Sequence, residues 1–148
     1  MNKLYIAAAL LALLPSCSPS SDKGELLASN TVVAVYEQTI DRPCMHMTSL
    51  CPDRCDHADK LAVFRVIRNE QYNRPGEYGD DKAEPGSPIY ISVLKDQEGQ
   101  DPSVRPFVSG LQPGDTVRFT VEHRYMDQNG SRYPARPVTR IEKVEKPS

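Results

Sequence analysis

A nine-residue segment with a two-residue period constrains the fold of this chain more than any other feature. Residues 117–125 read VRFTVEHRY, so apolar residues and His123 alternate with arginine, threonine and glutamate. This alternation predicts a β-strand with one buried face, and it places His123 on that face. Pro113-Gly114 before the segment fits the centre of a type II turn, and Asn129-Gly130 after it is typical of a chain reversal.

Other segments have the same strand character. They are residues 31–40 (TVVAVYEQTI), 60–68 (KLAVFRVIR), 88–95 (PIYISVLK) and, as a shorter candidate, 104–108 (VRPFV). A last strand is expected over about residues 136–144, where apolar residues recur at every third position and indicate a β-bulge. No segment after residue 16 has the spacing of an amphipathic helix.

Five or six strands of this kind predict an all-β domain over residues 31–148. We expect a small OB-like barrel of five to six strands, because a closed or partly open barrel protects strand edges. This likeness to OB folds rests on strand number and spacing, and a β-sandwich is the alternative. Residues 71–87 are rich in proline, glycine and charge and predict an exposed connection.

The first 16 residues have the pattern of a secretory signal peptide. Lys3 is followed by an apolar run over residues 4–14, which is too short to span a bilayer, and then by Pro15-Ser16-Cys17. The sequence Leu14-Pro15-Ser16-Cys17 resembles the lipobox of bacterial lipoproteins, with proline as a departure from the usual pattern. The resemblance implies cleavage before Cys17 and attachment of lipid to its sulfur. An ordinary cleaved signal peptide is the alternative.

A lipid on Cys17 would anchor the chain in the bacterial cell envelope, since two or more acyl chains are enough for stable membrane binding. In the lipoproteins that the segment resembles, an aspartate directly after the modified cysteine favours the inner membrane. Ser18 stands there in this chain, so the resemblance implies the outer membrane, facing the periplasm, with surface exposure left open. Residues 17–30 are then the lipidated cysteine and a serine-rich, flexible tether.

The charge of the processed chain argues against one class of partner. Residues 1–16 contain one lysine and no acidic residue, so cleavage leaves 17 basic and 20 acidic residues. A weakly acidic chain lacks the basic surface that nucleic-acid binding requires. The remaining length is typical of a single domain.

Residues 44–57 (CMHMTSLCPDRCDH) concentrate the side chains that can do chemistry. Five donors follow the spacing C-x-H-x4-C-x3-C-x-H, and they are Cys44, His46, Cys51, Cys55 and His57. Thiolates and imidazoles bind zinc or copper(I), and the thioethers of Met45 and Met47 beside His46 would favour copper(I). His123 is a candidate donor from outside the loop, although a histidine on a buried strand face is more often a hydrogen-bonded core residue.

The same cysteines allow two other interpretations. With Cys17 lipidated, three cysteines remain, and an odd number cannot all pair within one chain in an oxidising compartment. A disulfide with one thiol left over is the first alternative, and Pro52-Asp53 would form a turn inside a Cys51–Cys55 or a Cys44–Cys51 loop. A catalytic thiol is the second. A thioredoxin-type oxidoreductase is not expected, because the chain has no Cys-x-x-Cys pair.

We therefore expect a membrane-anchored envelope lipoprotein that is not an enzyme and that binds zinc or copper(I) through the loop 44–57. The metal would act as a structural clamp or be the cargo of a metal-handling protein. The alternative is an envelope interaction module with a disulfide-stapled loop, which binds a protein or a glycan. Metal content and a count of reactive thiols separate the two hypotheses.

Overall fold

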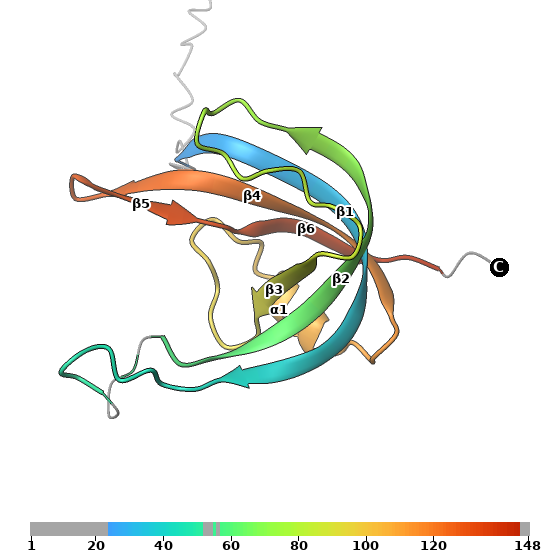
Figure 1. The fold of residues 1–148 in the computed structure, drawn as a ribbon, viewed down its shortest axis with the longest axis horizontal. Helices are drawn as coiled ribbons and strands as arrows, with labels where there is room; N and C mark the ends of the chain where they lie inside the picture. Colours follow the sequence, from blue (N-terminus) through green and yellow to red (C-terminus); the bar gives the residue numbers. More distant parts are fainter. Residues whose placement is uncertain (1–23, 52–54, 56, 146–148) are drawn as a thin grey trace, which may run out of the picture.

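The computed structural model describes residues 24–51, 55 and 57–145, so the expected signal peptide and Cys17 lie outside the described residues. This part of the chain forms six strands and one short helix (Figure 1). In chain order they are β1 (Glu25–Arg42), β2 (Asp59–Asn73), β3 (Pro88–Ser92), α1 (Val104–Ser109), β4 (Thr116–Gln128), β5 (Ser131–Ala135) and β6 (Val138–Lys143). The prediction of an all-β fold with five to six strands is confirmed.

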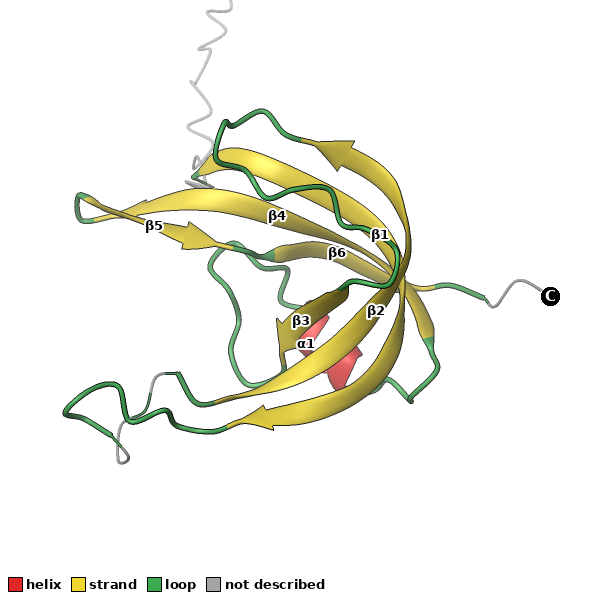
Figure 2. Cartoon of the chain, viewed as in Figure 1, coloured by secondary structure: helices red, strands yellow, loops and turns green. Residues whose placement is uncertain are grey.

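The strands form one antiparallel sheet, which is not closed into a ring. Its order is β3-β2-β1-β4-β5, and β6 pairs with the N-terminal half of β4, whose C-terminal half pairs with β5. The sheet curves strongly around α1, which lies on its concave side (Figure 2). An open, curved sheet of this kind is consistent with the expected small barrel or sandwich.

The two longest strands, β1 and β2, follow the curve because bulges interrupt their pairing. The register of β1 against β2 shifts at three places, between Thr31 and Val32, between Val33 and Ala34, and between Tyr36 and Gln38. Each such irregularity bends the strand and increases its twist. As a result, β1 reaches from the start of the domain to the base of the loop 43–58.

The first strand begins earlier than the sequence predicted. Residues 25–30 were expected to belong to the tether, but they form the start of β1 and pair with β4, with Ala28 opposite His123. Leu27, Ala28 and Asn30 are buried there, so apolar burial and pairing outweigh the polar composition of this segment. Residues 17–23 of the expected tether lie outside the described residues.

The core lies on the concave face of the sheet. The ring of Phe64 in β2 contacts Tyr36 in β1 and Phe119 in β4, with ring centroids 5.6 and 5.3 Å apart. Aromatic rings at these separations and tilts pack favourably. The buried face predicted for residues 117–125 is correct, since Val117, Phe119 and His123 are buried.

The segment 104–108 is not the short strand that we predicted, and the expectation that no helix is present was also wrong. Val104 and Val108 are four residues apart, which places both on the buried face of α1. The Oδ1 atom of Asp101 accepts hydrogen bonds from the backbone N–H and the hydroxyl of Ser103, which begins the helix. Pro106 falls in the first turn, where a missing N–H costs nothing.

The C-terminal strand is also divided differently from the prediction. The expected strand over residues 136–144 is preceded by β5, which contains Pro134, and Pro137 lies in the break between β5 and β6. The pairing of β4 with β6 shifts register between Thr120 and Val121 of β4, which agrees with the β-bulge predicted from the apolar spacing of residues 136–144. The reversal before β5 is a tight turn, because Asn129 and Gly130 both have positive φ angles and Gln128 pairs with Ser131.

The connection between β2 and β3 starts later than predicted, since β2 continues to Asn73. It then folds back against the start of β1, where the N–H of Gly76 donates to the carbonyl of Leu27 at 3.0 Å. The side chain of Asn30 holds the same connection by donating to the carbonyl of Asp81 and accepting the N–H of Ala83. These contacts place Asp80 next to the side chain of His123 in β4.

Candidate functional site

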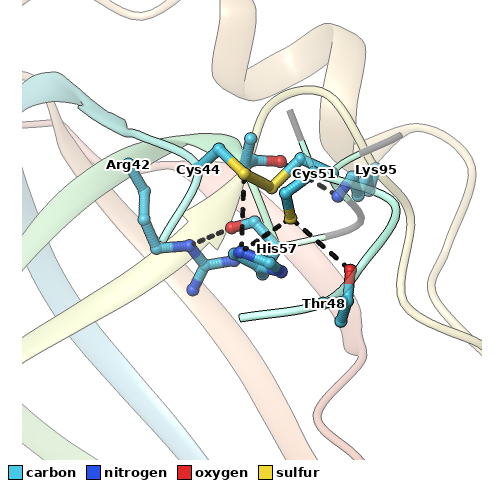
Figure 3. Close-up of a disulfide and its surroundings, with 8 residues drawn as sticks. Arg42, Cys44, Thr48, Cys51, His57 and Lys95 are labelled. Carbon is cyan, nitrogen blue, oxygen red and sulfur yellow. Dashed lines mark hydrogen bonds between the residues drawn. A yellow bond between two sulfur atoms is a disulfide. The ribbon is translucent and has the colours of Figure 1, made fainter. Parts of the chain in front are cut away.

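The loop 43–58 joins β1 to β2 and carries the predicted Cys/His donors. Its base is the pair of Arg42 and Asp59, which face each other at the end of the two strands. The Nε atom of Arg42 donates to the carbonyl of His57 at 2.9 Å, and Nζ of Lys95 donates to the carbonyl of Ala58 at 3.0 Å (Figure 3). These two cations hold the end of the loop, at residues 57 and 58.

Asp59 links the base of the loop to β3 through hydrogen bonds. Its buried Oδ1 atom accepts hydrogen bonds from the Ser92 hydroxyl at 2.8 Å and from the Lys60 N–H at 2.7 Å. The Ser92 oxygen in turn accepts the N–H of Lys95. The loop therefore stands on a hydrogen-bonded support that includes β3. The sequence analysis did not predict this support. The opposite charges of Arg42 and Asp59, on either side of the loop, could have indicated it.

Cys44 and Cys55 are joined by a disulfide, with their Cα atoms 5.9 Å apart. The structure thus pairs the two outer cysteines, rather than Cys51 with Cys55 or with Cys44 as the sequence had suggested. Cys51 is half-buried and lies outside this disulfide. Pro52 and Asp53, which we expected to form a turn, lie outside the described residues.

Cys51 sits beside the disulfide through contacts of its own. The Thr48 hydroxyl lies 3.5 Å from the Sγ atom of Cys51, and the backbone N–H of Cys51 donates to the Thr48 carbonyl at 3.2 Å. The Nε2 atom of His57 lies 3.9 Å from Cys51 Sγ and 3.7 Å from Cys44 Sγ. Figure 3 draws both contacts as dashed lines. One imidazole nitrogen therefore faces the disulfide and the third cysteine together.

Four of the five predicted donors form one group. The ligand atoms of Cys44, Cys51, Cys55 and His57 all lie within 4.8 Å of one another, and all four residues are half-buried. A tetrahedral zinc site with Zn–S bonds of about 2.3 Å has its sulfurs roughly 3.8 Å apart. The group is therefore close to the size that a metal ion requires, provided that the disulfide opens and the other two donors move inward slightly.

His46 and the two methionines do not belong to this group. His46 is exposed and has a φ angle of 53°, and it is not among the four clustered donors. Met45 and Met47 are 62% and 70% exposed. Their thioethers thus stand in solvent, and the arrangement does not favour the methionine-rich site that would select copper(I).

His123 lies far along the sheet from the loop. It is buried, it pairs with Ala28 near the beginning of β1, and its Nδ1 accepts the N–H of Asp80 at 3.2 Å. Burial lowers the pKa of His123, which favours the neutral ring that this hydrogen bond requires. The interpretation of His123 as a hydrogen-bonded residue of the buried face therefore fits better than that of an outside metal ligand.

A second feature of interest is a pocket of about 550 Å³ in the mouth of the curved sheet. Two ion pairs line it, Arg42 with Asp59 near the loop and Arg136 with Asp80. The exposed ring of Tyr90 in β3 also lines the pocket. A pocket with paired charges and one accessible aromatic ring can accept a neutral, partly polar ligand.

Comparisons of the chain with protein-family models, with curated proteins and with solved structures found no match in any of the three. In residues 24–51, 55 and 57–145, no helix has the length and apolar character needed to cross a bilayer.

Proposed function

We propose that this chain is an envelope lipoprotein whose domain binds a zinc ion through Cys44, Cys51, Cys55 and His57. The observation that carries the proposal is the convergence of three sulfurs and one imidazole nitrogen within 4.8 Å. Four donors of this kind complete a tetrahedral zinc shell of the Cys3His type. The donors come from one loop whose two ends are already fixed by the β1–β2 pairing.

Zinc fits this group better than copper(I) for two reasons. The thioethers that would favour copper(I) are exposed and stand outside the group. A zinc ion with three thiolates also carries a formal charge of −1, and Arg42 and Lys95, which hydrogen-bond the carbonyls of His57 and Ala58, supply positive charge beside it. The metal would clamp the loop, because Met45, Met47 and Leu50, the large apolar side chains in its described part, are exposed and do not form a core.

The envelope location rests on the N-terminal sequence. The lipobox-like residues before Cys17 support cleavage and lipid attachment there. Ser18, directly after that cysteine, supports the outer membrane as the location, with the domain facing the periplasm. Growth with radiolabelled palmitate tests this part, since label should enter the wild-type chain and be lost in the Cys17→Ser variant. Equal labelling of both chains would contradict the assignment of Cys17.

A second function is favoured by the Cys44–Cys55 disulfide itself. A stapled loop beside a pocket with an exposed Tyr90 suits an interaction module that binds a protein or a glycan. In that case the loop would bind no metal, and Cys51 would react with a thiol reagent while the other two cysteines react only after reduction.

Elemental analysis together with thiol titration tests the proposal. The full chain is purified under reducing conditions without chelator, and we expect about one equivalent of zinc per chain, as one tetrahedral site requires. The variant Cys51→Ser should lose the zinc and keep the fold, as checked by circular dichroism. A chain that is free of metal under these conditions, and that takes up none from added zinc, would contradict the proposal.

A further inference from the structure

The disulfide and the metal group share two sulfur atoms. Cys44 and Cys55 form the disulfide, and both are also among the four clustered donors. A sulfur in a disulfide no longer carries the thiolate charge that binds zinc. The oxidised loop therefore keeps only Cys51 and His57 as full donors, while the reduced loop has all four.

The oxidised loop already holds the other two donors beside the disulfide. The Nε2 atom of His57 lies 3.7 Å from Cys44 Sγ and 3.9 Å from Cys51 Sγ although the disulfide is closed. The support at the loop base, from Arg42 to the His57 carbonyl and from Lys95 to the Ala58 carbonyl, involves no sulfur atom. This support of His57 therefore does not depend on the disulfide, and Cys51 keeps its own contacts with Thr48. To receive an ion, the Cys44 and Cys55 side chains must separate and the other two donors move inward slightly.

We propose that the Cys44–Cys55 pair makes this site a redox-controlled zinc site, which holds the ion when the pair is reduced and releases it when the pair forms its disulfide. This inference rests on the proposed function. It adds a specific claim, namely that the exchanging pair is Cys44 with Cys55 and that Cys51 remains a thiol in both states.

The oxidant is a disulfide, either a small molecule or a protein. A thiolate of the pair attacks one oxidant sulfur and expels the first thiolate of the oxidant, which forms a mixed disulfide. The second thiolate of the pair attacks the cysteine sulfur of this mixed disulfide and expels the other half of the oxidant. Two electrons pass from the pair to the oxidant, the two expelled thiolates take up protons from water, and the zinc ion leaves as Zn²⁺.

The bacterial envelope gives such a pair a direct consequence, because it is an oxidising compartment. Bound zinc would slow oxidation of Cys44 and Cys55, since coordination makes a thiolate less nucleophilic toward a disulfide. When an oxidant closes the pair, the ion is released, and the loop stays folded through the disulfide in place of the metal.

The test uses the full chain carrying Cys17→Ser, in detergent, so that only the three loop cysteines report. The reduced chain is loaded with zinc, and oxidised glutathione is added while a metal-sensitive dye follows released zinc and mass spectrometry counts alkylated thiols. We expect one zinc to leave for each two thiols lost, with the disulfide mapped to Cys44 and Cys55. The zinc Kd of the oxidised chain should rise at least about 100-fold, beyond the 10- to 100-fold cost of losing an outer-shell partner.

A matched variant, Cys51→Ala, keeps the exchanging pair and lacks one donor. In the parent chain, zinc should slow oxidation of the pair, whereas in Cys51→Ala it should have much less effect. Equal zinc affinity of the reduced and oxidised chains, or a disulfide that includes Cys51, would overturn the redox inference and leave the zinc proposal standing. Failure of the reduced chain to bind zinc would overturn both.

Discussion

The Nε2 atom of His57 lies 3.9 Å from the Sγ atom of Cys51, which brings the end of the loop 43–58 back to its middle. The contact depends on the support of the loop base, because Arg42 holds the carbonyl of His57 itself. The two histidines of the loop therefore differ in role, because His57 belongs to the donor group whereas His46 is exposed and lies outside it.

Replacement of each loop histidine by glutamine should therefore give different results. His57→Gln removes the nitrogen donor, and we expect the zinc affinity of the reduced chain to fall by at least about 100-fold, more than an outer-shell change costs. His46→Gln is the matched control, and its affinity should stay within a few-fold of the wild type. Competition with a chromophoric chelator measures both values. A larger loss in His46→Gln than in His57→Gln would contradict the assignment of the donors.

Reduction of the disulfide without metal should weaken the domain. A disulfide that closes a loop of this size contributes at most about 3 kcal/mol in the chain-entropy model. We expect the free energy of unfolding in urea to fall when dithiothreitol is added together with a chelator, and to recover in part when zinc is added instead. The Cys44→Ser/Cys55→Ser chain serves as the control and should not respond to dithiothreitol. No change in the wild-type chain would show that the stapled loop does not contribute to stability.

The close packing of the β2–β3 connection on β1 predicts that alanine is tolerated at one glycine of the domain and not at another. A Cβ atom on Gly79 would lie 2.2 Å from the carbonyl oxygen of Leu27, which is backbone and cannot move aside cheaply. We expect Gly79→Ala to destabilise the domain by about 3 kcal/mol, the upper part of the range for overpacked sites. Gly110→Ala is the control, because the nearest atom lies 3.6 Å away and the φ angle of −92° suits alanine. Urea denaturation of both variants measures the difference, and equal midpoints would contradict this packing.

His123 should make stability depend on pH. Burial lowers its pKa below the ordinary value of 6.5, and Arg136 acts in the same direction, while Asp80 opposes them. The neutral ring therefore stabilises the fold fully above the unfolded pKa, and this contribution is lost as pH falls from about 6.5 toward the lower folded pKa. Replacement by glutamine removes the titrating ring, so the urea midpoint of His123→Gln should vary less between pH 7.5 and 5.

Asp80 contributes to the same cluster at lower pH. Two hydrogen bonds from Arg136, at 2.7 and 2.9 Å, lower the pKa of the Asp80 carboxyl. Its contribution is thus present at neutral pH and is lost only as pH falls through that lowered value. Above pH 5 the decline should belong to His123, and an unchanged pH profile in His123→Gln would contradict this assignment.

The sequence predicted those parts of the fold that depend on local alternation. Phe64 and Phe119 lie on the buried face because period-two patterns survive in β2 and β4. The sequence failed where long-range contacts decide, as at Leu27 and Ala28, which follow a polar, serine-rich segment but are buried where β1 pairs with β4 and the β2–β3 connection packs on it. It failed also at Val104 and Val108, because two valines around a proline fit a short strand as well as one helical turn.

The candidate site likewise has features that the local sequence predicted and features that only long-range contacts decide. Residue type and density identified the loop 44–57, but no spacing rule could pair Cys44 with Cys55 or separate His57 from His46. Those outcomes depend on how Arg42, Lys95 and Asp59 hold the loop base, and these contacts bring together residues from β1, β2 and the segment after β3.

The zinc K-edge X-ray absorption spectrum of the reduced, zinc-loaded chain tests the central claim most directly. The account predicts three sulfur neighbours at about 2.3 Å and one nitrogen neighbour at about 2.0–2.1 Å, and the loss of the nitrogen contribution in His57→Gln. A shell made only of oxygen or nitrogen atoms, or a spectrum that does not change when Cys51 is replaced by serine, would contradict it.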